Sequence, residues 1–327
     1  MTTMTPAASP RSDESKAQDP RSELRALIRA ELSREILPAA STLAAHVREL
    51  YGESVGSILF YGSCLRADSP EGVMDLYLLT RSNRDFNPTL PLAAANRLIP
   101  PNIYFWSIPS EEGELRGKGA AISLEQFQKS CEPGAWSPSI WARFCQPVVL
   151  VDSPTEADRE ATVDAVEQSI VTAAKWAAWL GPSTGSARDY WVALFRATYS
   201  VELRPERDDR PGLIVDANRE RYERLLPLAW KVAGISFEVE DGEYRPHVDG
   251  RPTKARGWRA RRALGKGLSV ARIVKGAFTF DGAVDYLLWK IERHSGVKVA
   301  ATEWQKRHPF LAAPSVFAKL WRAGAIR

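Results

Sequence analysis

The chain has 327 residues, of which 44% are hydrophobic and 26% are charged, and its formal net charge is +4. This composition is that of a folded globular protein and excludes collagen-like or wholly disordered chains. The longest purely apolar stretches span only a few residues, whereas a helix needs about 20 to cross a bilayer, so we expect no transmembrane span.

Helical and strand patterns alternate through the first half of the chain. Residues 1–20 lack an apolar core and contain several acids, so we expect a disordered lead-in and no targeting peptide. Apolar residues then recur at helical spacing over residues 22–37, with Ser22 as the expected cap, and residues 43–51 continue the pattern after Pro38. We expect the β-rich runs that follow to form a small mixed sheet, in which the first two are neighbouring strands; the runs are residues 57–61, 73–79, 102–108 and 148–151.

The second half is mainly helical by pattern. Ser123 and Gln126 are spaced as in a capping box and predict a short helix. An alternating stretch at residues 236–249, interrupted by Asp241-Gly242, predicts a β-hairpin. Three longer periodic stretches predict helices at residues 155–180, 190–199 and 219–232.

Two neighbouring strand ends carry residues suited to phosphate chemistry. Gly62 and Ser63 follow the first β-rich run, and Asp75 lies near the start of the second. A glycine lets the backbone approach a phosphate closely, and amide and hydroxyl groups there can donate to it. A carboxylate on the adjacent strand can hold a divalent metal against the same phosphate. This order resembles the nucleotidyltransferase superfamily, represented by polymerase beta; the plain alternative is an ordinary turn beside a solvated Asp75.

Tyr77 departs from the superfamily pattern. A second acid usually lies two residues after the first, on the same face of the strand. Two interpretations stay open: the metal takes fewer carboxylates from this strand, or the protein has lost catalysis.

Six segments, taken in chain order, carry a family resemblance: LFYGSCLRADSPEGVMDLYLL (59–79), NIYFW (102–106), KGAAISLEQF (118–127), WARFCQPV (141–148), YSVELR (199–204) and KGAFT (275–279). Together they resemble the mitochondrial-type peripheral phosphatidate cytidylyltransferases, also called the translocator assembly and maintenance family, and the resemblance covers residues 52–289. In this family the strand acid is likewise followed by a hydrophobic or aromatic residue, as at Tyr77. Cys64 stands where glycine is common, and Val201-Glu202 stands where the family has a Gly-Asp pair.

The resemblance implies a Mg²⁺-dependent reaction of CTP with phosphatidate that yields CDP-diacylglycerol and pyrophosphate. It implies that Asp75 and Lys118 are catalytic and that Asp75 and Glu202 hold the metal. It further implies a nucleotide site that consists of Gly62, Ser63, Lys118 and Arg204. Plain alternatives are a loop lysine at 118, an exposed ion pair between Glu202 and Arg204, and Asp68 as a different metal ligand.

The resemblance also sets the expected organisation. We predict an α+β protein, in which a nucleotidyltransferase-like domain with a mixed sheet is followed by a mainly helical domain and a basic segment. The expected boundaries are residues 1–20 for the lead-in, 21–153 for the nucleotidyltransferase-like domain, 154–250 for the helical domain and 251–327 for the basic, Trp-containing membrane-docking segment.

The basic segment indicates a polyanionic partner. Residues 251–327 hold 17 Lys and Arg against four Asp and Glu, a net +13, while the rest of the chain carries −9. Each Lys or Arg near an anionic bilayer contributes about 1 kcal/mol, and tryptophan favours the headgroup zone. Residues 315–326 could add a short interfacial helix. The cations expected to contact phosphatidate and the membrane are Arg259, Arg261, Arg262, Lys266, Arg272 and Lys275.

Alternatives to the membrane interpretation remain. Basic patches with aromatic residues also bind nucleic acid, which is an alternative to the favoured membrane partner, or form a solvated face above core tryptophans. The odd count of three cysteines, without a CxxC pair, favours a reducing compartment. We therefore expect a cytoplasmic protein on the inner face of the membrane. The other functions left open are a nucleotidyltransferase acting on RNA or on a small phosphorylated acceptor, and a non-catalytic membrane-associated relative.

Overall fold

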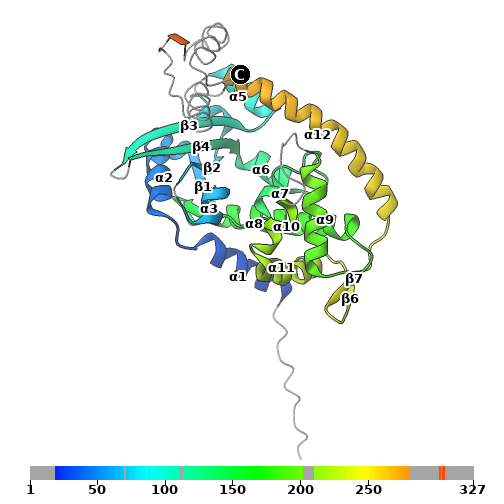
Figure 1. Ribbon diagram of the computed structural model, residues 1–327. Helices are drawn as coiled ribbons and strands as arrows, with labels where there is room; N and C mark the ends of the chain where they lie inside the picture. The colour runs from blue at the N-terminus through cyan, green and yellow to red at the C-terminus, as the bar shows by residue number, and fades with distance from the viewer. Residues whose placement is uncertain are drawn as a thin grey trace, which may run out of the picture.

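The protein is built around one mixed five-stranded sheet. The computed structural model describes residues 19–69, 71–87, 89–110, 113–201, 210–279, 302 and 304–305 (Figure 1). The strand order is β3-β4-β2-β1-β5; β2 and β4 run parallel, and the other neighbours are antiparallel. This confirms an α+β protein with a mixed sheet. The strands are β1 (Val55–Tyr61), β2 (Val73–Thr80), β3 (Asn102–Ser110), β4 (Gly113–Ser123) and β5 (Val149–Asp152).

β4 is the one strand of this sheet that the sequence patterns missed. Its glycines lower β-propensity in isolation. A Cβ at Gly117 would lie 2.2 Å from the side chain of Leu43, and one at Gly119 would lie 2.1 Å from the ring of Trp106. The glycines therefore leave room for large neighbouring side chains, and packing between elements determines the strand.

Helices cover both faces of the sheet. On one face, α2 (Pro38–Tyr51) packs its Leu43 and Val47 against alternate residues of β1 and β2 such as Leu76. On the other face, Tyr77 packs into a larger cluster with the helical part of the chain. The helices of the sheet half also include α3 (Ser63–Ala67), α4 (Asn83–Phe86), α5 (Leu90–Leu98), α6 (Leu124–Cys131) and α7 (Trp141–Phe144).

The helical half contains the long helices that periodicity predicted. The hairpin is also confirmed, with positive φ angles of 51° at Asp241 and 80° at Gly242. The predicted cap Ser22 is wrong: Asp19 caps α1 and accepts from the amides of Arg21 and Ser22, because the helix begins earlier, at Pro20. The elements are α1 (Pro20–Leu32), α8 (Glu156–Leu180), α9 (Ala187–Tyr199), α10 (Arg210–Asp216), α11 (Arg219–Val232), β6 (Phe237–Glu240) and β7 (Glu243–Pro246).

The basic segment begins with a long helix, α12 (Arg251–Thr279). Figure 1 shows α12 running along the edge of the molecule from the side of the hairpin to α5 and β3. Its Trp258 belongs to the hydrophobic cluster that joins Leu59 and Tyr77 of the sheet to α8, α9 and α11. No helix in the described ranges combines the length and apolar character that a bilayer crossing needs. Residues 1–18 of the lead-in and the helix expected at residues 315–326 lie outside these ranges.

Candidate functional site

The candidate site is a row of side chains across four strands. Tyr61 of β1 pairs with Asp75 of β2, Asp75 pairs with Lys118 of β4, and Lys118 pairs with Phe105 of β3. Residues directly opposite on adjacent strands project from the same face of the sheet. This is the face of Tyr77, two residues after Asp75, which packs against the helical part. Asp75 and Lys118, distant in sequence, therefore lie side by side.

Gly62 lies directly against the carboxylate of Asp75. An ideal Cβ at Gly62 would be 2.4 Å from Oδ2 of Asp75, and the φ of Gly62 is +95°. Both the close approach and the dihedral require glycine. Ser63 follows as an exposed residue at the start of α3. The structure thus brings Gly62, Ser63, Asp75 and Lys118 together, and it contributes nothing on Glu202 and Arg204, which lie outside the described residues.

Tyr77 occupies the position of the usual second acid and belongs to the core. Its ring is fully buried against Tyr61, Phe127 and Phe144, with centroid distances of 6.0, 5.7 and 4.9 Å. Burial raises the pKa of the Tyr77 hydroxyl well above its ordinary value, so the group stays protonated. This position supplies no charged oxygen to a metal.

With Tyr77 excluded, Asp75 is the carboxylate of the row that could bind a magnesium ion. Among the residues that the structure describes, no group of three or more Asp, Glu, His or Cys side chains could hold a metal. Mg²⁺ commonly uses only one or two carboxylates, with waters and substrate phosphates as further ligands. Asp75 therefore suits an ion held between the protein and a bound nucleotide. Asp68, the other acid considered from the sequence, is exposed at the end of α3 with a left-handed backbone.

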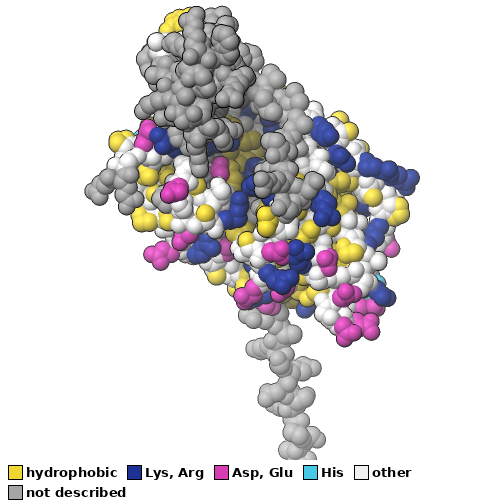
Figure 2. All heavy atoms as spheres, viewed as in Figure 1, with side chains coloured by type: hydrophobic (Ala, Val, Ile, Leu, Met, Phe, Trp, Pro, Cys, Tyr) yellow, Lys and Arg dark blue, Asp and Glu magenta, His cyan; other side chains and the backbone are white. Residues whose placement is uncertain are grey.

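Two arginines on the same face were missed from the sequence. Arg116 lies two residues before Lys118 on β4 and contacts Glu114. The guanidinium carbon of Arg143, on α7, lies 5.4 Å from the ring centroid of Tyr61. Because side chains alternate between the two faces of a strand, Arg116 could have been identified from its spacing to Lys118 on β4. Arg143 lies near Tyr61 only because α7 packs against the sheet, which the sequence pattern does not indicate. Figure 2 shows Lys and Arg side chains near the middle of the side of the molecule that faces the viewer and along the edge that α12 forms.

The six cations expected to contact a membrane divide into two groups. Lys275 is buried, and its Nζ donates to three oxygens, including Oδ1 of Asn102 at 2.9 Å; burial lowers its pKa to about 8. Arg272 donates to the carbonyl of Pro100 and to the hydroxyl of Ser139. Arg261 donates to carbonyls of the 133–135 turn. These three fasten α12 to the protein itself, whereas the exposed cations are Arg259, Arg262 and Lys266.

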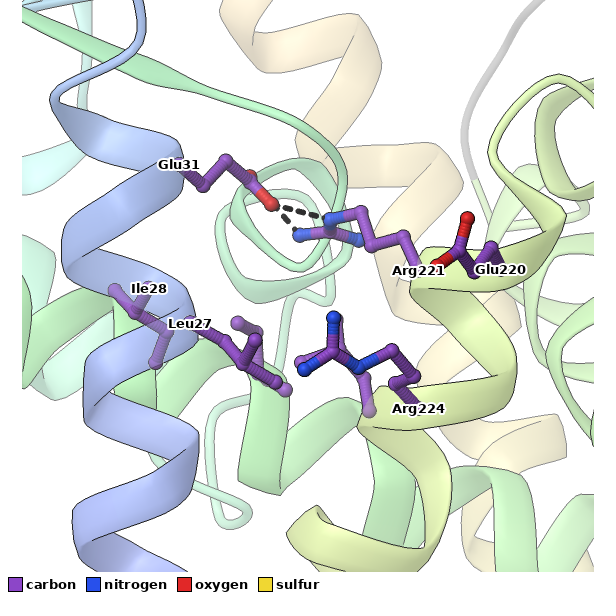
Figure 3. Close-up of a pocket in the computed structure, with 8 residues that line it drawn as sticks. Leu27, Ile28, Glu31, Glu220, Arg221 and Arg224 are labelled. Atoms are coloured by element: carbon purple, nitrogen blue, oxygen red, sulfur yellow. Dashed lines mark hydrogen bonds and ion pairs between the residues drawn. The ribbon is translucent and has the colours of Figure 1, made fainter.

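A separate cavity of about 220 Å³ lies between α1, α8 and α11 (Figure 3). Glu31 and Arg221 face each other across it in an ion pair of 2.5 Å. Glu31 also accepts from the amide of Val148, and Arg221 donates to the carbonyl of Cys145. Both partners thus also bind the segment that follows α7. The ion pair therefore connects α1 and α11 to the C-terminal end of α7, the helix that carries Arg143.

Comparison of the chain with known protein families and curated proteins identifies no relative. No model of a protein family matches the chain, and no curated protein matches it in sequence. The family resemblance therefore rests on the motifs and stays a prediction.

Proposed function

We propose that the protein is a Mg²⁺-dependent nucleotidyltransferase with a nucleotidyltransferase-like fold, and that it transfers the cytidylyl group of CTP to phosphatidate. The observation that carries the proposal is the convergence of Gly62, Asp75 and Lys118 on one face of the sheet. The substrates come from the family resemblance. The products are CDP-diacylglycerol, an intermediate of phospholipid biosynthesis, and pyrophosphate.

The residues of the row suit this chemistry by position and charge. A phosphate oxygen of phosphatidate attacks the α-phosphorus of CTP, and the bond from that phosphorus to the pyrophosphate oxygen breaks. The nucleophile is largely ionised near neutral pH because its second pKa is about 6, so no strong general base is needed. Asp75 would hold Mg²⁺, which when bound neutralises phosphate charge. Lys118 and Arg143 would add further positive charge beside the triphosphate, and Gly62 leaves room for the carboxylate of Asp75.

The exposed side of α12 supports a peripheral membrane location on the inner, cytoplasmic face. Arg259, Arg262 and Lys266 would each contribute about 1 kcal/mol next to an anionic bilayer. Interactions of this kind are screened by salt. We therefore expect high salt to weaken binding to liposomes more than it weakens binding to nucleotide.

An acceptor-exchange assay tests the proposal. Purified protein is incubated with Mg²⁺, labelled CTP and one of three acceptors: phosphatidate liposomes, an RNA, or a small phosphomonoester. We expect label in the lipid fraction only. Label in RNA or in the small acceptor would retain the nucleotidyltransferase chemistry and overturn the lipid substrate. No transfer to any acceptor, with an active phosphatidate cytidylyltransferase as positive control, would overturn the enzymatic proposal.

The buried Tyr77 favours one alternative, a non-catalytic membrane-associated relative. In this case the row holds, among the described residues, a single carboxylate, Asp75, because Tyr77 on the same strand face is part of the core. Calorimetry with CTP and Mg²⁺, together with liposome flotation, separates the two. Binding to liposomes without binding to CTP supports the alternative.

A further inference from the structure

A second cavity, of about 320 Å³, lies between α8 and α12. We call it the α8–α12 cavity. Trp176 and Trp179, three residues apart on α8, form one wall. Lys254 and Arg261, seven residues apart and hence on one side of α12, form the other, with Gly257 between them. Arg261 lies over the ring of Trp176, which is only 2% exposed, and Lys254 lies over the ring of Trp179, so it is the two cations that face the space.

Arg261 is only partly satisfied by the protein. Its guanidinium carbon lies 4.6 Å from the ring centroid of Trp176. Nε donates to the carbonyl of Ala135 at 3.1 Å, and Nη2 donates to carbonyls of the same turn. Nη1 has no hydrogen-bond acceptor within the described ranges, and a Cβ at Gly257 would lie 3.9 Å from it. One end of the guanidinium thus points toward the gap above Gly257.

Neither cation has a counter-ion in the described part of the chain. Nζ of Lys254 lies 4.3 Å from the ring centroid of Trp179 and makes no hydrogen bond or ion pair there. Arg261 likewise forms no ion pair among these residues, and burial lowers its pKa. A partly buried cation without a carboxylate partner loses hydration that an anion would replace. The cavity therefore has positive charge that nothing described in the protein neutralises.

The space above Gly257 is open. Apart from Nη1 of Arg261, no atom of the described residues outside the backbone of α12 lies within 4 Å of the position that a Cβ at Gly257 would take. A larger residue there would project toward the cavity. The volume of about 320 Å³ lies at the lower end of the range for small-molecule pockets, which suits a compact anion.

We propose that the α8–α12 cavity binds a small phosphomonoester. A phosphate monoester has a charge of about −1.5 to −2 at pH 7, which matches two cations better than a single carboxylate does. Lys254 and Nη1 of Arg261 donate to the phosphate, while the rings of Trp179 and Trp176 beneath them hold the two cations in place. This site lies between helices, away from the row at Asp75, and does not depend on the proposed transferase activity.

Isothermal titration calorimetry with phenyl phosphate tests the site. Inorganic phosphate serves as the probe without a ring, and benzyl alcohol as the ring without charge. We expect phenyl phosphate and inorganic phosphate to bind with affinities within about tenfold of each other, and benzyl alcohol not to bind measurably, because the two cations recognise the phosphate. Binding of benzyl alcohol as tight as that of phenyl phosphate would overturn recognition by charge. Absence of heat with every probe at millimolar concentration would overturn the site.

Matched variants locate the bound phosphate. Lys254→Gln should weaken binding about tenfold by removing one charge-assisted contact. Gly257→Leu should abolish it, whereas the control Gly267→Leu should not, since no described residue places an atom within 4 Å of a Cβ at Gly267, the backbone of α12 aside. Thermal unfolding of both leucine variants checks that each is folded. Binding that survives Gly257→Leu in a folded protein overturns the proposal.

Two further variants exclude other anion sites. Arg262→Gln removes an exposed cation of the same helix, so affinity should stay unchanged. Asp75→Asn should also leave binding intact, because the proposed active site is not involved. An equal loss in Arg262→Gln would indicate a diffuse surface effect, and a change in Asp75→Asn would place the probe at the sheet; either result overturns the α8–α12 cavity as the site.

Discussion

Replacement of Gly62 by alanine tests whether the backbone of this residue and the carboxylate of Asp75 form one rigid unit. Gly62 has a φ of +95°, and the new Cβ would lie 2.4 Å from Oδ2 of Asp75. Gly52 supplies a matched control, because its φ is +51° while no atom in the described part of the chain, its two sequence neighbours aside, lies within 4 Å of its Cβ position. Both variants are destabilised by an unfavourable backbone conformation. Only in Gly62→Ala does the new methyl group also collide with Asp75.

The magnitudes separate the two effects. An L-residue in such a conformation costs on the order of 1–3 kcal/mol, so both variants should unfold at a temperature lower by roughly 2–10 °C. Restoring an ordinary contact of at least 3.4 Å at Gly62 requires Asp75 to move by about 1 Å. A misplacement of about 1 Å at a reacting centre can reduce the rate about 100-fold.

The assay is thermal unfolding together with Mg²⁺-dependent transfer from labelled CTP. We expect similar unfolding temperatures and a loss of transfer on the order of 100-fold in Gly62→Ala only. Equal transfer by Gly62→Ala and Gly52→Ala would refute the reasoning that links this backbone to Asp75.

Three further predictions concern stability, reactivity and binding. Glu167→Gln should lower the free energy of unfolding in urea by about 2 kcal/mol, because the buried carboxylate accepts from two arginines of α1; Asp164→Asn, at a more exposed partner of the same network, should cost less than about 1 kcal/mol. Burial raises the pKa of the Cys131 and Cys145 thiols to about 12, so a thiol reagent at pH 8 should label them on the order of a thousandfold more slowly than free cysteine until the protein unfolds; fast labelling of the native protein would contradict their burial. Arg143→Gln should weaken CTP binding about tenfold in calorimetry without a change in unfolding temperature; unchanged affinity would remove Arg143 from the site.

Most of the sheet and the long helices could be predicted because their signals are local. The runs at β1 and β2 are apolar and β-branched or aromatic, and the periodicity of α8 extends over many turns. β4 could not be predicted in this way, because its glycines are required by the close contact of the side chains of Leu43 and Trp106, which no local pattern indicates. Its parallel pairing with β2, which places Lys118 beside Asp75, is a consequence of topology.

The site residues that lie at strand ends could be predicted from the sequence. Those that tertiary packing brings to the site could not. Gly62 and Asp75 are linked by the short connection between neighbouring strands. Arg143 lies on a one-turn helix whose position depends on tertiary contacts, so no local pattern indicates that it faces Tyr61. The basic segment shows the same limit, because its charge gave no indication that Lys275 is buried.

The central claim is that Asp75 acts with Mg²⁺ in transfer from CTP to phosphatidate. The most direct measurement is the rate of CDP-diacylglycerol formation from labelled CTP and phosphatidate liposomes, with and without Mg²⁺, in the unchanged protein, in Asp75→Asn and in Asp85→Asn. Asp85 is an exposed acid of α4 and serves as the control. We expect Mg²⁺-dependent product from the unchanged protein and from Asp85→Asn, and a loss of at least about 100-fold in Asp75→Asn. Full activity of Asp75→Asn, or no product from the unchanged protein, would contradict the claim.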